Sequence, residues 1–102
     1  MTCSVVITKR AEKSLRKVPE QVARNFFTWK GQVEEEGIEV IRKLPGYHDE
    51  PLQGKLNGYV RSARLGRGYR VYYSVQAGKL KCIIVEEVNH HDYKEIERLF
   101  GL

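Results

Sequence analysis

Two arginines stand at positions where they could hold one phosphate between them. Residues 59–76 form two apolar-rich segments around a Gly-Arg-Gly turn, a pattern that predicts a β-hairpin. If Leu65 pairs with Tyr69, then Arg64 lies directly opposite Arg70. Facing guanidinium groups repel each other, but a phosphate between them would accept paired hydrogen bonds from both. We therefore predict that Arg64 and Arg70 form a phosphate site.

The charge of the surrounding segment indicates which kind of ligand brings the phosphate. Residues 51–85 contain no Asp or Glu, and they hold seven of the 18 Lys and Arg residues of a chain whose net charge is +5. Cations held on a rigid sheet favour a polyanion, and nucleic acid is the first candidate. Besides the arginine pair, the candidate contacts are Lys55 in the loop before the hairpin, Arg61 in its first strand and Arg67 in its turn.

Strand alternation divides the hairpin side chains between two faces. The core face is expected to carry Ala63, Leu65, Val71, Tyr73 and Val75. Arg61 shares this parity, so it could instead extend along its stem to the strand edge. Ser62 and Tyr72 should share the opposite face with the arginine pair, and Tyr72 is therefore a further candidate RNA contact. Alternatively, the arginines are only solvated, or an acid of another element such as Glu86 neutralises them.

A second cluster of reactive side chains follows the last predicted strand. The sequence Asn-His-His-Asp-Tyr at residues 89–93 places His90, His91 and Tyr93 next to one another. Histidine titrates near neutral pH and is suited to proton transfer, and tyrosine can donate a hydrogen bond. Alternatively, Asp92 only caps the final helix and the histidines are ordinary surface residues. A metal site is not indicated, because a third ligand is not evident.

The two clusters together suggest one reaction, the cleavage of RNA by attack of its own 2′-hydroxyl group. That reaction needs a base for the 2′-hydroxyl, cations for the charge that develops on phosphorus, and an acid for the leaving 5′-oxygen. Cationic strands beside a cluster of His and Tyr could supply each part without a metal or another cofactor.

Hydrophobic periodicity and turn residues define the elements that must position these side chains. Ahead of the hairpin they predict a strand and three helices, at residues 4–8, 9–17, 19–36 and 38–44, with Thr8 as the first helix cap. The second helix should bury Val22, Phe26, Trp29 and Val33. A polar loop at residues 47–58 leads to three strands at 59–65, 69–76 and 79–88 and a short helix at 92–100. This order predicts an α+β fold with a largely antiparallel sheet.

Length and composition place these elements in one domain, residues 1–102. The sequence has no apolar run of 18 residues and no signal-peptide pattern after Met1, so we expect a cytoplasmic protein that does not enter the membrane. Cys3 and Cys82 form no CxxC motif, so a zinc site is not indicated.

Three stretches of this sequence resemble the RelE/ParE superfamily, the toxins of bacterial type II toxin–antitoxin systems. They are the Leu-x-Gly-Tyr and Arg-Leu motifs at residues 56–65, the Gly-Tyr-Arg-Val-Tyr motif at 68–72, and the Val-Asn-x-His-Asp-Tyr motif at 88–93. The combination is more specific than any one motif, and the order of elements fits the superfamily along nearly the whole chain. The resemblance implies a RelE-like fold, in which an N-terminal strand and helices precede an antiparallel β-meander and a short C-terminal helix.

The resemblance also implies an activity and two partners. RelE-like members enter the ribosomal A site and cut mRNA, and a cognate antitoxin neutralises them in a hetero-oligomer. Arg64 and Arg70 match the strand cations of the family, and Tyr93 with His90 or His91 matches its C-terminal catalytic group. Two alternatives stay open at this point: a gyrase-inhibiting toxin of the ParE type, and a nucleic-acid-binding relative that has lost its activity.

Overall fold

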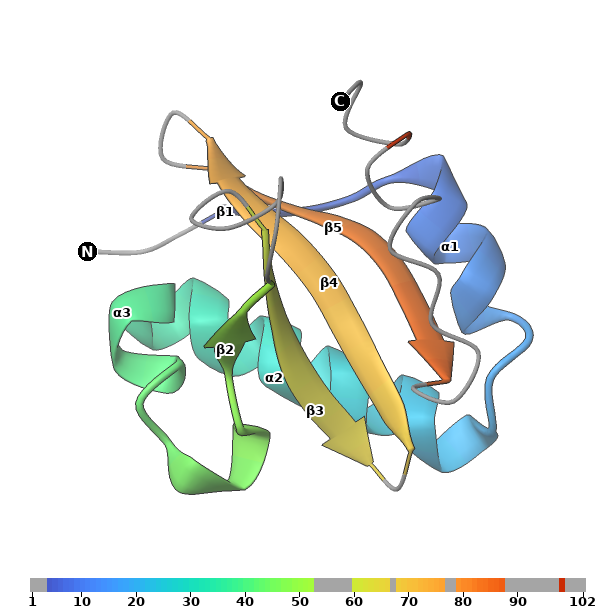
Figure 1. The fold of residues 1–102 in the computed structure, drawn as a ribbon, viewed down its shortest axis with the longest axis horizontal. Helices are drawn as coiled ribbons and strands as arrows, with labels where there is room; N and C mark the ends of the chain where they lie inside the picture. The colour runs from blue at the N-terminus through green and yellow to red at the C-terminus, as the bar shows by residue number, and fades with distance from the viewer. Residues whose placement is uncertain (1–3, 53–59, 67, 77–78, 88–97, 99–102) are drawn as a thin grey trace.

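A mixed β-sheet with helices on one face forms the framework of the molecule (Figure 1). The structure is a computed structural model that describes residues 4–52, 60–66, 68–76, 79–87 and 98, with backbone alone at 81–87. Within these residues, no helix is long and apolar enough to cross a membrane.

The N-terminal part follows the predicted order of one strand and three helices. Strand β1 covers Ser4–Ile7 and helix α1 covers Lys9–Leu15. The Thr8 side chain caps α1, because its Oγ1 accepts a hydrogen bond from the Ala11 backbone N–H at 3.1 Å. Helix α2, Glu20–Glu36, begins after Pro19 and ends at Gly37, whose positive φ of 89° suits glycine.

The apolar stripe of α2 forms the centre of the core. Its four predicted residues, at helical spacing, are all buried: Val22, Phe26, Trp29 and Val33. The predicted third helix is shorter than expected, because α3 covers only Ile38–Ile41 and a 3-10 turn, η1, follows at Pro45–Tyr47. A proline cannot continue the helical hydrogen-bond ladder, which explains why a new turn begins there.

Five strands form the described sheet in the order β1-β5-β4-β3-β2. The three predicted long strands are β3, Arg61–Gly66, β4, Tyr69–Gln76, and β5, Lys79–Glu87, and they form an antiparallel meander. The sequence did not predict two other pairings: β1 runs parallel to β5, and a two-residue strand β2, Glu50–Pro51, pairs with β3. The predicted C-terminal helix lies outside the described residues, except for Arg98.

One face of the sheet packs against the helices, as strand alternation predicted for most of the hairpin. Ala63, Leu65, Val71 and Tyr73 are at most 2% exposed and belong to the same core cluster as the α2 stripe. The prediction was wrong for Val75, which is 50% exposed. Val75 lines a hollow with Ile38 and Arg42, and the register of β4 against β5 shifts shortly before it, between Tyr72 and Tyr73. Strand alternation alone therefore did not predict its exposure.

The register of the central hairpin brings the predicted arginine pair together. Arg64 is the direct backbone partner of Arg70, as expected. The predicted pairing of Leu65 with Tyr69 is wrong, because Gly66 pairs with Tyr69 and the register shifts by one residue at Leu65. Leu65 still lies in the core, on the face that it shares with Ala63 by strand alternation.

Candidate functional site

Arg70 is held in place by the backbone and side chains around it. Its Nε donates to Ser62 Oγ at 2.9 Å, and its Nη2 donates to the carbonyl oxygens of Ser62 at 3.1 Å and of His48 at 2.5 Å. The side chain is only 12% exposed. Several bonds to a planar guanidinium group fix both its position and its orientation, so Arg70 presents a preformed charge rather than a mobile one.

The segment between η1 and β2 provides the other groups near Arg70. His48 is exposed and has a left-handed backbone, with φ of 43°, which is uncommon for a residue with a side chain. The carboxylate of Glu50 lies 3.9 Å from Arg70 Nη2, and its side chain is 67% exposed. Among the described side chains, Glu50 is the acid that forms an ion pair with Arg70. Glu86, the acid considered from the sequence, is the backbone partner of Arg70 on β5, but its side chain is not described.

Arg64 differs from its partner, because its side chain is exposed and forms no recorded hydrogen bond or ion pair with the described part of the chain. It lines a hollow of about 270 Å³ at the end of β3, between η1 and α2, together with Asn25, Thr28 and Tyr47. The register brings Arg64 and Arg70 together, yet one guanidinium group is anchored and the other is available. The available charge is the one that a ligand can recruit.

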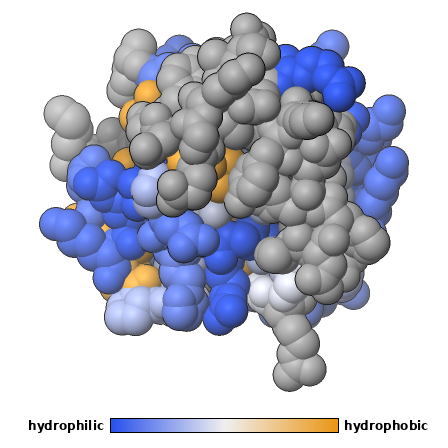
Figure 2. Space-filling model, in the orientation of Figure 1, coloured by the Kyte–Doolittle hydropathy of each residue, from blue (hydrophilic) through white to orange (hydrophobic). Residues whose placement is uncertain are grey.

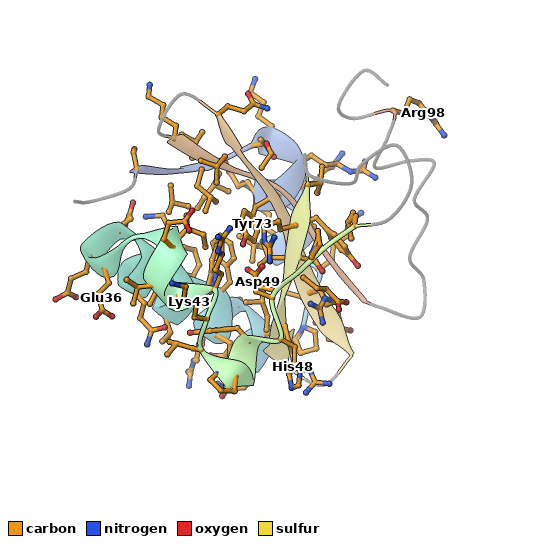
Figure 3. The ribbon with its side chains drawn as sticks, turned by 60° about the vertical axis from the view of Figure 1, so that its left-hand side comes forward. Glu36, Lys43, His48, Asp49, Tyr73 and Arg98 are labelled. Atoms are coloured by element: carbon orange, nitrogen blue, oxygen red, sulfur yellow. The ribbon has the colours of Figure 1, made fainter. Side chains whose placement is uncertain are left out.

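Arg61 has a structural role that the sequence did not predict. Its Nε donates to Asp49 Oδ1 at 2.6 Å, and the hydroxyl of Tyr73 donates to the other carboxylate oxygen. The Asp49 side chain is fully buried, whereas that of Arg61 is 29% exposed. Figure 3 shows Asp49 and Tyr73 side by side between the helices and the sheet, with His48 at the outer edge of the molecule.

The electrostatics of this group follow from burial and from the carboxylate. Burial, and then the charge and hydrogen bond of Asp49, raise the pKa of Tyr73 far above its ordinary value. Burial alone would lower the pKa of Arg61, but the hydrogen bond and charge of Asp49 outweigh it and raise the pKa. At neutral pH Tyr73 therefore keeps its proton and Arg61 keeps its positive charge. Arg61 is largely occupied within this group, which does not fit its predicted role as an RNA contact.

The structure describes one further candidate contact, Tyr72, and leaves the remaining candidates as predictions. Tyr72 pairs with Ser62 as expected, but it is fully buried, so it offers no surface for the predicted RNA contact. Strand alternation predicted that Tyr72 shares a face with Ser62, but it could not predict that the Tyr72 side chain is buried. The remaining candidates lie outside the described residues: Lys55, Arg67, His90, His91 and Tyr93.

Sequence reasoning missed three consecutive residues, His48, Asp49 and Glu50. They fall in the segment that we predicted only as a polar loop, although an imidazole and two carboxylates directly before Pro51 were a visible signal. Within the described residues, no three His, Cys, Asp or Glu side chains come together as metal ligands. The described site thus consists of an anchored cation, an available cation, a solvent-facing carboxylate and an imidazole.

These groups lie at the edge of the sheet formed by β2 and β3. In the view of Figure 1 the helix α2 lies behind the sheet, and Figure 2 shows that the described part of the front surface is mostly hydrophilic. Such a surface suits a charged ligand better than an apolar one.

Known structures share this arrangement of elements, although no protein-family model and no curated protein matches the sequence. A chain of the archaeal RelE–RelB complex from Pyrococcus horikoshii is 29% identical with a TM-score of 0.67, over 89% of this chain and 100% of that one. This protein has the fold of the RelE-like toxins. The resemblance to the RelE/ParE superfamily is thereby confirmed.

Two more distant structures have the RelE-like fold in common with this chain. A chain of the toxin–antitoxin complex RelBE2 from Mycobacterium tuberculosis is 23% identical with a TM-score of 0.64, over 85% of this chain and 99% of that one. YafQ from E. coli strain BL21(DE3) is 14% identical with a TM-score of 0.68, over 86% and 96% of the two chains. Both likenesses extend over most of this chain and nearly all of the other.

Proposed function

We propose that this protein is the toxin of a type II toxin–antitoxin pair and that it cuts mRNA in the ribosomal A site by attack of the 2′-hydroxyl group. The observation that carries the proposal is the pairing of an anchored arginine, Arg70, with an exposed one, Arg64, on adjacent central strands. A phosphodiester that approaches this pair meets one fixed cation and recruits the other. Both charges then stabilise the extra negative charge that builds up on the phosphate oxygens.

The neighbouring side chains can move the protons. The Glu50 carboxylate, exposed and beside Arg70, is placed to accept the proton of the 2′-hydroxyl. The new 2′-oxygen–phosphorus bond forms as the bond to the 5′-oxygen breaks, which leaves a cyclic phosphate and a 5′-hydroxyl. The acid that protonates this oxygen is the exposed His48 or one of the predicted C-terminal groups, His90, His91 and Tyr93. No step requires a metal ion.

An antitoxin is part of the proposal. The RelE–RelB structure from Pyrococcus horikoshii and the RelBE2 structure from Mycobacterium tuberculosis are complexes. This chain has a net charge of +5 and exposes large apolar side chains such as Phe27, which is 54% exposed. An acidic partner that also brings apolar side chains would match both properties.

The test is to map mRNA 5′ ends after brief induction of the protein in a bacterial host. We expect new 5′ ends within translated reading frames, and we expect Arg64→Gln to abolish most of them. Arg16→Gln is the control, because it removes an exposed arginine from the C-terminal cap of α1, a helix that packs against β5. Intact mRNA in cells that stop growing, together with altered DNA supercoiling, would replace this proposal with the gyrase alternative.

A further inference from the structure

The carboxylate of Asp49 is buried in a position where a polar loop would ordinarily face water. Its side chain is fully buried, whereas its neighbours His48 and Glu50 are exposed. Burial of a carboxylate is costly unless charged and polar partners surround it. Here Arg61 Nε lies 2.6 Å from one oxygen, and the Tyr73 hydroxyl donates to the other. The segment is therefore fastened to β3 and β4 through one side chain.

The residues on both sides of Asp49 contact the same guanidinium group. The carbonyl of His48 accepts from Arg70 Nη2 at 2.5 Å, and the Glu50 carboxylate lies 3.9 Å from the same nitrogen. Because these residues are consecutive, a displacement of Asp49 would move both contacts. Ser62 of β3 accepts two of the hydrogen bonds of Arg70, and the loop that Asp49 fastens supplies the third acceptor and the nearby carboxylate.

Few backbone bonds could hold this segment in the absence of Asp49. Strand β2 pairs with β3 at two positions, Glu50 with Ser62 and Pro51 with Arg61, and one further backbone bond joins the Leu52 N–H to the Val60 carbonyl at 3.0 Å. On the other side, the His48 N–H bonds within its own turn, to the Pro45 carbonyl at 3.2 Å. A packing role alone would not need a charge, since apolar residues often replace a buried ion pair without loss of stability.

We propose that Asp49 is a positioning residue for RNA cleavage: its buried carboxylate, bound by Arg61 and Tyr73, holds residues 48–50 so that they fix the guanidinium group of Arg70. This inference rests on the proposed function for its catalytic consequence. The positioning itself can be measured without any activity.

The first test observes Arg70 directly by NMR. The Nε–H signal of Arg70, assigned by its loss in Arg70→Lys, should exchange slowly with water in the native protein because Ser62 Oγ accepts its hydrogen bond. In Asp49→Asn we expect this signal to shift and to exchange at least about tenfold faster. Glu12→Gln is the matched control, because it removes the carboxylate of an exposed Glu–Arg pair on α1 and should leave the signal unchanged. A folded Asp49→Asn protein with an unaltered Arg70 signal would overturn the proposal.

The second test measures cleavage of mRNA on programmed ribosomes, normalised to folded protein. Asp49→Asn should lower the rate at saturating ribosome roughly 10- to 100-fold, with little change in the half-saturating ribosome concentration. A loss confined to ribosome affinity, or no loss at all, would contradict the proposal. Tyr73→Phe keeps the ring and removes one bond to Asp49, so it should act in the same direction with a smaller effect. If Asp49→Asn does not fold, the cleavage rate of Tyr73→Phe tests the proposal instead, and an unchanged rate would contradict it.

The two tests separate the two claims. If the native protein cuts no mRNA but Asp49→Asn still releases the Arg70 signal, the proposed function fails and the positioning stands. If cleavage occurs and neither variant changes it, the proposed function stands and Asp49 has no positioning role.

Discussion

At the scale of single residues, the account depends on an asymmetry between two arginines that share one backbone pair. Arg70 is 12% exposed and has three hydrogen bonds, whereas the Arg64 side chain is exposed and forms no hydrogen bond or ion pair with the described residues. A fixed charge costs little reorganisation when substrate binds, and an available charge supplies new binding energy. The sequence predicted the pair but not the bulge: Gly66, and not Leu65, pairs with Tyr69, and the shift at Leu65 restores the pairing of Arg64 with Arg70. The asymmetry was not predicted.

Replacement of the available arginine should affect activity without affecting stability. For Arg64→Gln we expect the rate of mRNA cleavage on ribosomes to fall roughly 10²- to 10³-fold, since one group that stabilises developing charge is lost. The unfolding free energy should change by less than about 0.5 kcal/mol, because the side chain is exposed. Urea denaturation beside the cleavage assay checks both. A large loss of stability would show that Arg64 has a structural role.

Tyr73 should make the protein sensitive to alkali. Burial raises its pKa well above the ordinary value of 10.0, so the folded protein keeps this proton where the unfolded chain loses it. The contribution of Tyr73 to the unfolding free energy is therefore fully present below pH 10. Above pH 10 it falls by about 1.4 kcal/mol per pH unit. Urea denaturation from pH 9 to 11 should show a shallower decline for Tyr73→Phe than for the native protein. Equal slopes would contradict the raised pKa.

At the scale of elements, the sequence predicted the features that depend on residues close together in the chain. The α2 stripe and the Thr8 cap were predicted because each depends on neighbours within one helical turn. Strand β2 was missed because two residues carry no period, and the β1–β5 pairing was missed because it joins residues about 75 positions apart. Asp49 was missed for a related reason: its partners Arg61 and Tyr73 come from distant strands, so nothing nearby in sequence marks it as buried.

The cap of α1 offers a direct test at this scale. Thr8→Ala removes the acceptor for the Ala11 N–H and should lower the unfolding free energy by about 1 kcal/mol. Thr8→Ser keeps the hydroxyl group and should lower it far less. Thermal or urea denaturation of the three proteins provides the comparison. Equal losses in both variants would mean that the methyl group, and not the cap, stabilises this end of α1.

At the scale of the whole molecule, charge is segregated along the chain. Seven cations and no acid occur between residues 51 and 85, within a chain that has 18 basic and 13 acidic residues. The structure uses part of this charge internally, since Arg61 binds Asp49 and Arg70 lies near Glu50. Composition therefore predicts a class of ligand, but it does not predict which cations are used inside the fold.

The salt dependence of RNA binding should show whether Arg64 contacts a phosphate or only adds to the net charge. We expect binding of a short RNA with 2′-deoxy substitution at the cleavage site to weaken as salt rises, with a slope in log–log form of about −0.7 for each phosphate contact. Arg64→Gln should remove about one such unit, while Arg16→Gln removes the same charge from α1 and should leave the slope unchanged. Fluorescence anisotropy over a salt series measures this. Equal slopes for both variants would mean that only net charge matters.

The central claim is that Arg64 and Arg70 act on one phosphate, and a double-mutant cycle tests it most directly. The cycle compares single-turnover cleavage of ribosome-bound mRNA by the native protein, Arg64→Gln, Arg70→Lys and the double variant. Residues that act as a unit give strongly non-additive losses, so we expect the double variant to be little slower than the slower single variant. Losses that simply multiply would show that the two arginines act independently and would contradict the account.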